Sequence, residues 1–320
     1  MALFSFVLFL SFFGTLFVRY VARKKELLDR PNERSSHAVA TPHGGGLAIM
    51  TAFYAGLVWL YIDGHVDAPL FFALLCALPV VAVSQIDDLL SLPAKVRFAV
   101  QAASAVAALY ALGGTDVMAF GLFRLDGPWL NAAAFLLIVW YTNLYNFLDG
   151  IDGYAGAEAV FAGGAAFLLF GSDVGLLIAA ASAGFLVFNW HRASIFMGDV
   201  GSAPLGFIFA VLTLHAAATP DFVVWIVLLS LFWFDATLTL WRRFRCRETL
   251  TQAHRKHAYQ RLVQAGFSHD KVVLSAMLLN AVLFGVLWLL PQHDAWVALA
   301  AAAALLYGAV RYIDAKKAFA

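Results

Sequence analysis

The sequence predicts an all-α, polytopic integral membrane protein, and three observations support this fold class. Of the 320 residues, 62% are hydrophobic and 13% are charged, against about 25% charged residues in typical soluble domains. The mean hydropathy is +0.81. Almost the whole chain divides into apolar blocks of roughly 20 residues, the length that a helix needs to cross a hydrocarbon core. We therefore expect a single transmembrane domain over residues 1–320, with no separate soluble domain.

The apolar blocks predict eleven transmembrane helices, at residues 2–21, 45–62, 68–86, 96–113, 128–146, 155–170, 174–190, 203–218, 221–240, 271–290 and 295–313. The sixth and seventh are short, and they form two crossings only if Gly171, Ser172 and Asp173 make a tight turn. One long buried hairpin over residues 155–190 is the alternative, so a count of ten crossings also fits the sequence.

An odd number of crossings places the two termini on opposite sides, and the basic residues decide the orientation. With the N-terminus outside, the basic loops fall in the cytoplasm, and Arg124 is the one basic residue of 21 that lands outside. The C-terminus is then cytoplasmic. The opening segment has no basic residue before its apolar run, so we expect a retained first helix rather than a cleaved signal. Cys76 and Cys246 suggest neither a disulfide nor a metal cage.

Five polar clusters interrupt the apolar blocks, and in this topology all five face the cytoplasm. Their sequences are RPNERSSHAVATPHGGG, QIDDLLSLPAKVRFAVQ, NLYNFLDGIDGYAG, HRASIFMGDVGSAP and RRFRCRETLTQAHRKHAYQRL. Polar and ionisable side chains are costly in hydrocarbon, so clusters of them at a membrane edge indicate a functional site. We expect the working face at the cytoplasmic lipid boundary.

Asp87 and Asp88 end the predicted third helix. Adjacent carboxylates repel each other, so one of them keeps a proton unless a cation lies between them; either state suits a proton acceptor or a magnesium ligand. A solvated helix end is the plainer interpretation. Lys95 and Arg97 follow at a distance suited to phosphate binding, which favours a site.

Asn143, Asn146 and Asp149 recur at three-residue spacing at the end of the predicted fifth helix, and Asp152 follows. Residues at this spacing share one broad helix face, so the first three can converge on one ligand before two glycines break the helix. Helix capping is the alternative. Four such side chains within eleven residues favour a metal or nucleotide site.

The segment from Phe196 to Ser202 precedes the predicted eighth helix and includes Asp199. Its glycines allow backbone N–H groups to approach an anion, and Asp199 adds a hard oxygen ligand for a divalent cation. Phe196 either stacks on a base or packs at the membrane interface.

The last polar loop carries His254, Arg255 and His257, which suit pyrophosphate or sugar hydroxyls, with the two histidines on one face of any helix that forms there. Attraction of a basic loop to anionic lipid headgroups is the alternative, and it fits the upstream residues 242–247 best. In the first loop, His37, His43 and the glycines at 44–46 either admit a phosphate or make a turn.

These clusters, in this order and on one side, resemble the polyprenyl-phosphate N-acetylhexosamine-1-phosphate transferases, glycosyltransferase family 4. The resemblance extends from Asp29 to Arg261 and rests on Asp-Asp, then NxxNxxDGxDG, then GDxGS, then a histidine-containing loop. It implies ten or eleven transmembrane helices and the transfer of a sugar 1-phosphate from a UDP-linked N-acetyl sugar to a polyprenyl phosphate such as undecaprenyl phosphate. Mg²⁺, or Mn²⁺ in its place, is the implied cofactor, and UMP is released.

The resemblance also implies roles for individual residues. Asp199 and Asn146 are expected to bind the metal, and Asp87 or Asp88 to deprotonate or position the acceptor phosphate. The remaining expected substrate contacts are Lys95 to phosphate, Asp152 and Phe196 to uridine and its base, Asn143 and Asp149 to a shared ligand, and His254, Arg255 and His257 to the diphosphate or sugar. Direct displacement and a covalent two-step mechanism both stay open.

Within the family, the chain resembles the branch that initiates O-antigen or other surface polysaccharides in the bacterial inner membrane, with its site facing the cytoplasm. The cell-wall branch, which uses a UDP-muramyl pentapeptide, has a denser histidine triplet than the HRKH at residues 254–257. His43 departs from the arginine that often stands at this point of the first loop. Neither the UDP-sugar nor the oligomeric state follows from the sequence, although a homodimer is compatible with it; no nucleic-acid partner is expected.

Two other function classes fit less well. CDP-alcohol phosphatidyltransferases also use Asp and Gly on a membrane helix, but they need Ala-Arg soon after the first Asp-Gly, and Asp149 is followed by Gly-Ile-Asp-Gly-Tyr-Ala-Gly. A transporter or proton-coupled carrier predicts ionisable residues near the bilayer midplane and an internal repeat. Glu158, His215 and Asp235 lie towards helix ends, and no halves match.

Overall fold

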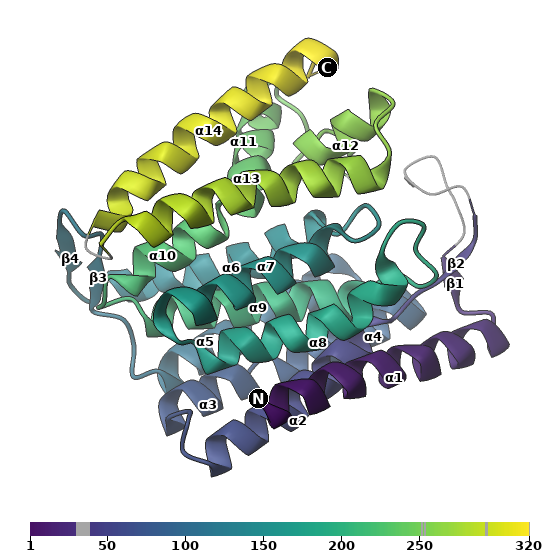
Figure 1. Cartoon of the computed structure of the whole chain (residues 1–320), viewed down its shortest axis with the longest axis horizontal. Coiled ribbons are helices and arrows are strands. Elements are labelled where there is room, and N and C mark those ends of the chain that lie inside the picture. Colours follow the sequence, from purple (N-terminus) through teal and green to yellow (C-terminus); the bar gives the residue numbers. More distant parts are fainter. Residues whose placement is uncertain (30–38, 251, 253, 292–293, 320) are drawn as a thin grey trace.

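The computed structural model describes residues 1–29, 39–250, 252, 254–291 and 294–319, and nearly all of the regular secondary structure in these residues is helical (Figure 1). Part of the first polar loop, including His37, lies outside the described residues. The helices are α1 (Ala2–Lys24), α2 (Gly46–Ile62), α3 (Ala68–Leu75), α4 (Leu78–Leu90), α5 (Ala94–Ala111), α6 (Leu130–Phe147), α7 (Tyr154–Phe170), α8 (Asp173–Asn189), α9 (Asp199–His215), α10 (Asp221–Leu228), α11 (Ser230–Arg245), α12 (Ala258–Gln264), α13 (His269–Leu289) and α14 (Ala295–Lys316).

Each predicted apolar block is helical in the structure, which confirms an all-α membrane protein. Four stretches are long and apolar enough to span a bilayer: α1, the α3–α4 pair, α13 and α14. The bent pair α10–α11 adds a fifth. Four further apolar helices, α2, α7, α8 and α9, have 17 residues each. The number of crossings and their orientation stay predictions.

Helix α1 shows the inside-out pattern of a lipid-facing helix. Its large apolar side chains are exposed at helical spacing, on Phe6, Phe9, Phe13 and Phe17, whereas Ser11 and Thr15 are fully buried. Ser11 Oγ donates to the carbonyl of Ala181 on α8 at 2.5 Å. A Cβ on Gly184 would lie 2.4 Å from the carbonyl oxygen of Leu8, so small residues allow the two helices to touch.

The predicted crossing at 68–86 lies within Ala68–Leu90, a stretch long and apolar enough to span a bilayer, but the structure divides this stretch into two helices. Helix α3 ends at Leu75 and α4 begins at Leu78. Pro79 lies in the first turn of α4, where its missing N–H has no helical partner to lose, and its ring excludes an uninterrupted helix through the carbonyl of Leu75. The break sets the direction of α4, whose end carries Asp87 and Asp88.

The stretch predicted as one helix at 221–240 is long and apolar enough to span a bilayer only as a pair of helices, α10 and α11, which meet at an angle of 66°. A straight helix would satisfy the carbonyl of Ile226 with the N–H of residue 230. In the bent pair the indole N–H of Trp233 donates to that carbonyl instead, at 2.8 Å. The side chain therefore replaces the backbone partner lost at the bend.

The residues at 155–190 form two separate helices of 17 residues, α7 and α8, which pack against each other. Gly171 joins them with φ at +74°, and Ser172 caps α8 by accepting from the N–H of Gly175 at 3.1 Å. A Cβ on Gly163 would lie 2.3 Å from the carbonyl oxygen of Gly175, so glycine is required at this contact. The predicted tight turn is confirmed; whether each helix is a crossing stays a prediction.

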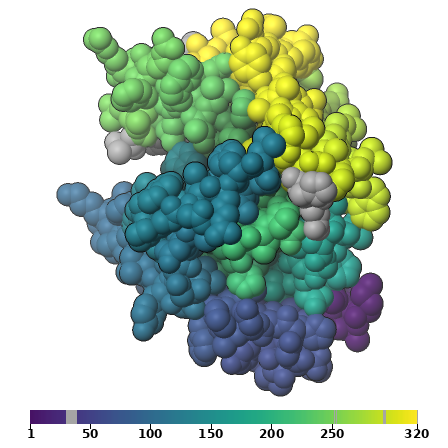
Figure 2. Space-filling view, turned by 90° about the vertical axis from the view of Figure 1, so that its left-hand side faces the viewer, coloured from purple at the N-terminus to yellow at the C-terminus, as the bar shows by residue number. Residues whose placement is uncertain are grey.

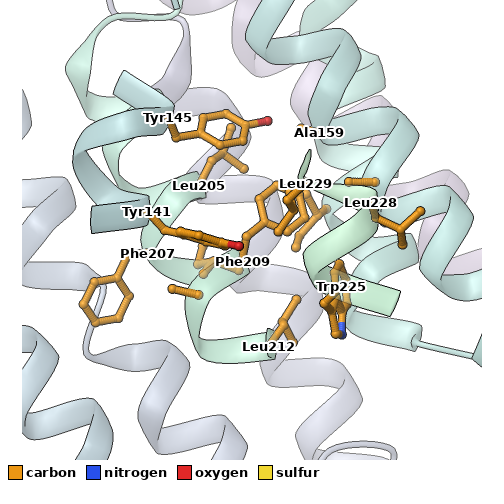
Figure 3. Packing of buried hydrophobic residues seen from close by; sticks show 14 of the residues in the cluster. Tyr141, Tyr145, Ala159, Leu205, Phe207, Phe209, Leu212, Trp225, Leu228 and Leu229 are labelled. Atoms are coloured by element: carbon orange, nitrogen blue, oxygen red, sulfur yellow. The ribbon is translucent and has the colours of Figure 1, made fainter. Parts of the chain in front are cut away.

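Helix α9 is the centre of the bundle and is buried from Val200 to Leu214. It packs against α2, α4, α6 and α10. Figure 3 shows part of this core, where the Tyr145 ring stacks on Phe209 with centroids 5.7 Å apart. Because α9 is held along its whole length, its first residue, Asp199, has a fixed position at one end of the bundle.

Two short antiparallel hairpins lie at opposite ends of the bundle (Figure 1). One pairs β1 (Leu28–Asp29) with β2 (Thr41–Pro42), and the other pairs β3 (Val117–Ala119) with β4 (Arg124–Asp126). Figure 2 looks onto the end that carries β3 and β4, with the yellow C-terminal helix above the blue segments of the first half of the chain. The polar clusters lie at the other end, beside β1 and β2.

Candidate active site

A cavity of about 480 Å³ opens where the polar clusters meet, between the ends of α4 and α6 and the beginnings of α9, α12 and α13. Seven of the side chains singled out from the sequence line it: His43, Asp88, Asn146, Asp149, Asp152, Phe196 and Asp199. The structure does not bring seven others into its wall: Asp87, Lys95, Arg97, Asn143, His254, Arg255 and His257. A binding role for those outside the wall stays a prediction.

Backbone contacts between glycines bring the first loop to the segment before α9. The N–H groups of Gly45 and Gly46 donate to the carbonyls of Phe196 and Met197 at 2.9 and 2.8 Å. A Cβ on Gly46 would lie 2.3 Å from the Cα of Gly201, so the two chains touch without side chains between them. Close packing was neither of the two interpretations of the triple glycine, and the N–H groups of Gly45 and Gly46 are already bonded and not available to a phosphate.

Asp88 caps the N-terminus of α9. Its carboxylate oxygens accept from the backbone N–H groups of Asp199 and Val200 at 3.2 and 3.3 Å. The approach needs glycine at position 198, which has φ at +76° and where a Cβ would lie 2.7 Å from Asp88 Oδ2. A carboxylate at a helix N-terminus is stabilised by the N–H groups and by the helix dipole. Asp88 and Asp199 are therefore held side by side.

Asp87 points to a different partner from Asp88. Its carboxylate accepts from the N–H of Leu92 at 2.6 Å and from Arg97 NH1 at 2.5 Å, and the same Arg97 nitrogen lies 3.2 Å from Asp199 Oδ2. Arg97 thus bridges α4 and α9. The sequence marked both Lys95 and Arg97 as phosphate ligands. Neither lines the cavity, but Arg97 contacts Asp199, whereas Lys95 is exposed on the first turn of α5.

Asn146 reaches the cavity from the last turn of α6. Its amide nitrogen donates to Ser202 Oγ at 3.0 Å, which ties α6 to the first turn of α9. Asn143, one turn earlier, donates instead to Gln101 on α5 at 2.9 Å and to the carbonyl of Val139. The two residues were predicted to share a helix face and one ligand. In the structure Asn146 lines the cavity, whereas Asn143 contacts α5.

Asp149 is buried in the loop after α6. Burial, and then the negative charges of Asp199 and Asp88, raise the pKa of Asp149 well above its ordinary value. Crowded carboxylates of this kind attract a cation, and an all-oxygen set of carboxylate and amide groups is what Mg²⁺ prefers. The donor chemistry at this end of the cavity therefore fits the metal that the sequence suggested.

Asp152 is surrounded by hydrogen-bond donors. His191 Nδ1 lies 2.8 Å from Asp152 Oδ2, the N–H of Ala193 lies 3.2 Å from that oxygen, and His269 Nδ1 lies 3.2 Å from it. Burial raises the pKa of Asp152, but the hydrogen bonds from His269 and His191 outweigh burial and lower the pKa below its ordinary value. Asp152 is thus held ionised.

The sequence did not point to His191 or His269. His191 lies in the polar cluster that also contains Phe196, so its position in that cluster was a signal for a site residue. His269 is the first residue of a helix far along the chain and had no such signal. The ligating atoms of Asp152, His191 and His269 lie within 4.8 Å of one another, a composition that metal centres also use. The contacts of 2.8 and 3.2 Å are hydrogen-bond lengths, and we interpret the cluster as hydrogen-bonded.

The last polar loop contributes Tyr259 and Gln260 to this region rather than its histidines. Tyr259 OH donates to the carbonyl of Phe147 at 3.0 Å, and a Cβ on Gly150 would lie 2.0 Å from that hydroxyl. Gln260 lines the cavity. The fifth cluster thus packs against the third, because the Tyr259 side chain fills the space next to Gly150.

The two histidines of that loop do not lie on a helix, because α12 begins after them at Ala258. Asp235 on α11 accepts from the N–H of Ala258 at 2.9 and 3.0 Å, and His257 Nδ1 lies 3.6 Å from it. The rings of His254 and His257 are 4.8 Å apart. Burial, followed by His257 and Arg243, lowers the pKa of His254 to about 4, so this side chain is neutral at physiological pH.

The fold and the cavity define a class of protein: an all-α membrane protein with a carboxylate-rich site at its helix ends. Residues 70–217 match the family model for glycosyl transferase family 4. The chain is 28% identical to a probable undecaprenyl-phosphate N-acetylglucosaminyl 1-phosphate transferase of Bacillus subtilis (strain 168), over 89% of this chain and 83% of that protein.

Two further relatives extend this likeness. A decaprenyl-phosphate N-acetylglucosaminephosphotransferase of Mycobacterium leprae (strain TN) is 30% identical, over 86% of this chain and 80% of that protein. An undecaprenyl-phosphate alpha-N-acetylglucosaminyl 1-phosphate transferase of Escherichia coli (strain K12) is 29% identical, over 89% and 82% respectively. The chain belongs to glycosyltransferase family 4, the polyprenyl-phosphate N-acetylhexosamine-1-phosphate transferases. The resemblance found from the motifs is confirmed.

Proposed function

We propose that this protein transfers an N-acetylhexosamine 1-phosphate from a UDP-linked sugar to undecaprenyl phosphate or a related polyprenyl phosphate, and releases UMP. The relatives carry names of this reaction type and match most of the chain. The observation that carries the proposal is the group of carboxylates around the beginning of α9, next to Arg97. Such a group suits two phosphate-bearing substrates that must be aligned and neutralised.

Mg²⁺ is the cation that we propose for this end of the cavity, with Mn²⁺ as a substitute. Asp199 and Asn146 would hold it, with Asp149 and Asp88 close by. When bound, a divalent ion neutralises charge on the phosphate oxygens of the donor. Two observations support this cation: the side chains offer only oxygen ligands to a metal, and the negative charges of the neighbouring carboxylates exceed the single positive charge of Arg97.

Of the two adjacent aspartates, we assign Asp88 to the acceptor phosphate. Asp88 lines the cavity, whereas Asp87 is bonded to Leu92 and Arg97 outside its wall. In the reaction an oxygen of the acceptor phosphate attacks the β-phosphorus of the UDP-sugar, and the bond from that phosphorus to the UMP oxygen breaks. Asp88 would accept a proton from, or orient, the attacking phosphate. Direct displacement is the simpler form of this step.

The surroundings of Asp88 support a lipid substrate. The next two residues, Leu89 and Leu90, are 50% and 73% exposed, so an apolar surface adjoins the carboxylate. A polyprenyl phosphate could place its chain along such a surface and its phosphate in the cavity. We propose that this end faces the cytoplasm from a bacterial inner membrane, with eleven crossings and the N-terminus outside.

We further propose that the product starts a lipid-linked surface polysaccharide such as O-antigen. The HRKH at residues 254–257 supports this branch over the one that uses a UDP-muramyl pentapeptide. UDP-linked N-acetylglucosamine, N-acetylfucosamine and N-acetylquinovosamine are the donors to compare. Recognition of their hydroxyl pattern depends on contacts that differ between these sugars.

The test is turnover by the purified protein in detergent with undecaprenyl phosphate, Mg²⁺ and each UDP-N-acetyl sugar in turn. We expect UMP release and a sugar-diphosphate lipid with at least one donor, and the loss of both when Mg²⁺ is withheld. Folded protein that turns over none of the donors would contradict the proposal. The variant Asp173→Asn, altered at the far end of the bundle, serves as the control and should keep wild-type turnover.

A further inference from the structure

The cluster of Asp152, His191 and His269 draws three separate parts of the chain to one carboxylate. Asp152 lies in the loop between α6 and α7, His191 follows α8, and His269 is the first residue of α13. The side chains of Asp152 and His269 are 8% and 9% exposed, and that of His191 is 27% exposed. No other group of three such ligating side chains as close as this was found among the described residues.

The contacts to Asp152 all involve one of its two carboxylate oxygens and leave the other for the cavity. The recorded side-chain bonds of Asp152 in the described part of the chain all go to Oδ2, from His191, His269 and the N–H of Ala193. His269 Nδ1 also lies 3.3 Å from the backbone N of Asp152, so the imidazole binds this residue in either tautomer. Since Asp152 lines the cavity and Oδ2 carries these contacts, Oδ1 is the oxygen left for a ligand.

The charge of Asp152 limits what that ligand group can be. An ionised carboxylate repels phosphates, and the phosphates are expected at the other end of the cavity, beside Arg97 and the metal ligands. Asp152 therefore suits a neutral hydrogen-bond donor, such as the N–H of a pyrimidine base or a ribose hydroxyl. A fixed acceptor binds such a donor better than a mobile one, because less conformational freedom is lost on binding.

We propose that His191 and His269 are positioning residues for the nucleoside part of the donor: they hold the Asp152 carboxylate turned so that Oδ1 accepts from the nucleoside. This inference rests on the proposed function and adds two residues to it. Neither histidine contacts the reacting phosphates, so they act on the binding of the nucleotide and not on the chemical step. The two imidazoles thus set the affinity for one substrate only.

The test compares two replacements of His191. His191→Phe keeps a ring of similar size and removes the N–H, whereas His191→Asn keeps a donor close to the position of Nδ1. The matched control is His65→Phe at the far end of the bundle, because His65 Nδ1 makes the same kind of contact to Asp173 Oδ2 at 2.7 Å. For each variant, KM and kcat are measured with the UDP-sugar and with the polyprenyl phosphate, and the Kd of UMP is measured by calorimetry.

We expect His191→Phe to raise the KM for the UDP-sugar and the Kd of UMP by about tenfold, the usual effect of losing a hydrogen bond to a charged group. The KM for the lipid should not change, and kcat should stay within about threefold. His191→Asn should recover most of the UMP affinity, and His65→Phe should match the wild type. In an Asp152→Asn background, His191→Phe should have no further effect.

An unchanged UMP affinity in His191→Phe would overturn the inference, as would a fall in kcat with unchanged KM for the UDP-sugar. If His191→Phe does not fold, the same measurements on His269→Asn and Asp152→Asn decide, because both should weaken UMP while leaving the lipid KM unaltered. A wild-type protein that binds UMP without turnover would contradict the proposed function and leave the inference to be judged on UMP alone. A wild-type protein that does not bind UMP would contradict both.

Discussion

Two histidine–aspartate pairs lie at opposite ends of the bundle with nearly the same geometry. His191 Nδ1 is 2.8 Å from Asp152 Oδ2, and His65 Nδ1 is 2.7 Å from Asp173 Oδ2. The side chain of Asp152 is 8% exposed, whereas that of Asp173 is 28% exposed and that of His65 is 52% exposed. An exposed pair of this kind contributes about 0–1 kcal/mol because water and salt screen it. Burial, and not residue type, separates the two pairs.

The two ends also differ in how their charges are grouped. At the far end a cavity of about 310 Å³ includes His65, Asp173, His215 and Asp221 in its wall, beside apolar side chains such as Trp225. His215 and Asp67 form a further exposed pair there, at 3.3 Å. At the site end, Asp88, Asp149 and Asp199 crowd around the N-terminus of one central helix. The comparison teaches that a site is defined by carboxylates that the fold forces together.

The largest expected difference between the two ends comes from removing one carboxylate charge at each. Asp199→Asn should lower kcat by about 10²–10³-fold, because it removes a charged oxygen that would hold the metal against the donor phosphates. Asp173→Asn should leave kcat unchanged. UMP release at saturating substrates measures both, with circular dichroism to show that each variant is folded. Equal activities would break the comparison.

Replacing one glycine by alanine at each end distinguishes the effect of a steric clash with Asp88 from the effect of backbone strain alone. Gly198 and Gly64 have φ at +76° and +78°, so alanine costs about 1 kcal/mol of backbone strain at either position. A Cβ at 198 would lie 2.7 Å from Asp88 Oδ2, whereas a Cβ at 64 meets nothing within 4 Å. Gly198→Ala should therefore lose about tenfold to a hundredfold in kcat/KM by displacing Asp88.

Gly64→Ala is the control for that strain and should retain wild-type kcat/KM with only a small fall in thermal midpoint. Both variants can be compared in the same UMP-release assay. Similar activity of the two variants would show that the contact between Gly198 and Asp88 does not matter to function.

An arginine at each end tests whether bridging two carboxylates has consequences that a surface pair lacks. Arg97 contacts both Asp87 and Asp199, whereas Arg124 pairs with Asp126 with both side chains more than half exposed. One nitrogen of Arg97 makes both contacts, and Arg97→Lys keeps the charge on a shorter side chain that does not reach that position, so we expect kcat/KM to fall by about tenfold. Arg124→Lys should change nothing measurable. Steady-state kinetics on the two variants decides.

The smallest expected effect is a pH dependence of stability from His254. The pKa of His254 is about 4 in the folded protein, against about 6.5 in an unfolded chain. Between these values the unfolded chain binds a proton at this residue and the folded chain does not, so His254 makes the protein less stable as the pH falls. His254→Asn should remove about 1 kcal/mol of this loss between pH 7.5 and 5, after allowing for solvent screening.

Thermal midpoints of the wild type and His254→Asn in detergent, taken across pH 5 to 7.5, measure this difference. The two curves should converge at the upper end of the range and separate at the lower end. Parallel curves would mean that burial of His254 does not control its protonation.

Much of the fold followed from the sequence because lipid forces a simple rule: each crossing is an apolar helix of nearly fixed length. Helices α2 (46–62) and α7 (154–170) end where the sequence predicted, and each begins one residue from the predicted start at 45 or 155. The breaks at Cys76 and Leu229 were missed, since both halves of each broken helix remain apolar and the hydropathy pattern does not change across them. Pro79 was a signal for the first break, and nothing comparable marks the second.

The site residues also fall into two groups: those that the sequence predicted and those that only the structure identified. Asp88, Asp149 and Asp199 could be found because they stand in short motifs at the ends of apolar blocks. Arg97 and Lys95 look equivalent in the sequence, and only the direction of α5 shows which one meets Asp199. His269 could not be found, because its contact with Asp152 joins residues separated by 117 positions and depends on where α13 begins.

The sequence by itself determined that the chain is helical and membrane-embedded, that its chemistry collects at one end of the helices, and which family it resembles. These properties follow from composition, block length and local motifs, which need no knowledge of neighbours in space. Only the tertiary structure decided that Asp88 and not Asp87 meets the cavity, that the triple glycine packs against α9, and that two histidines surround Asp152. The reason is physical: close packing of helices selects among side chains that local sequence leaves equivalent.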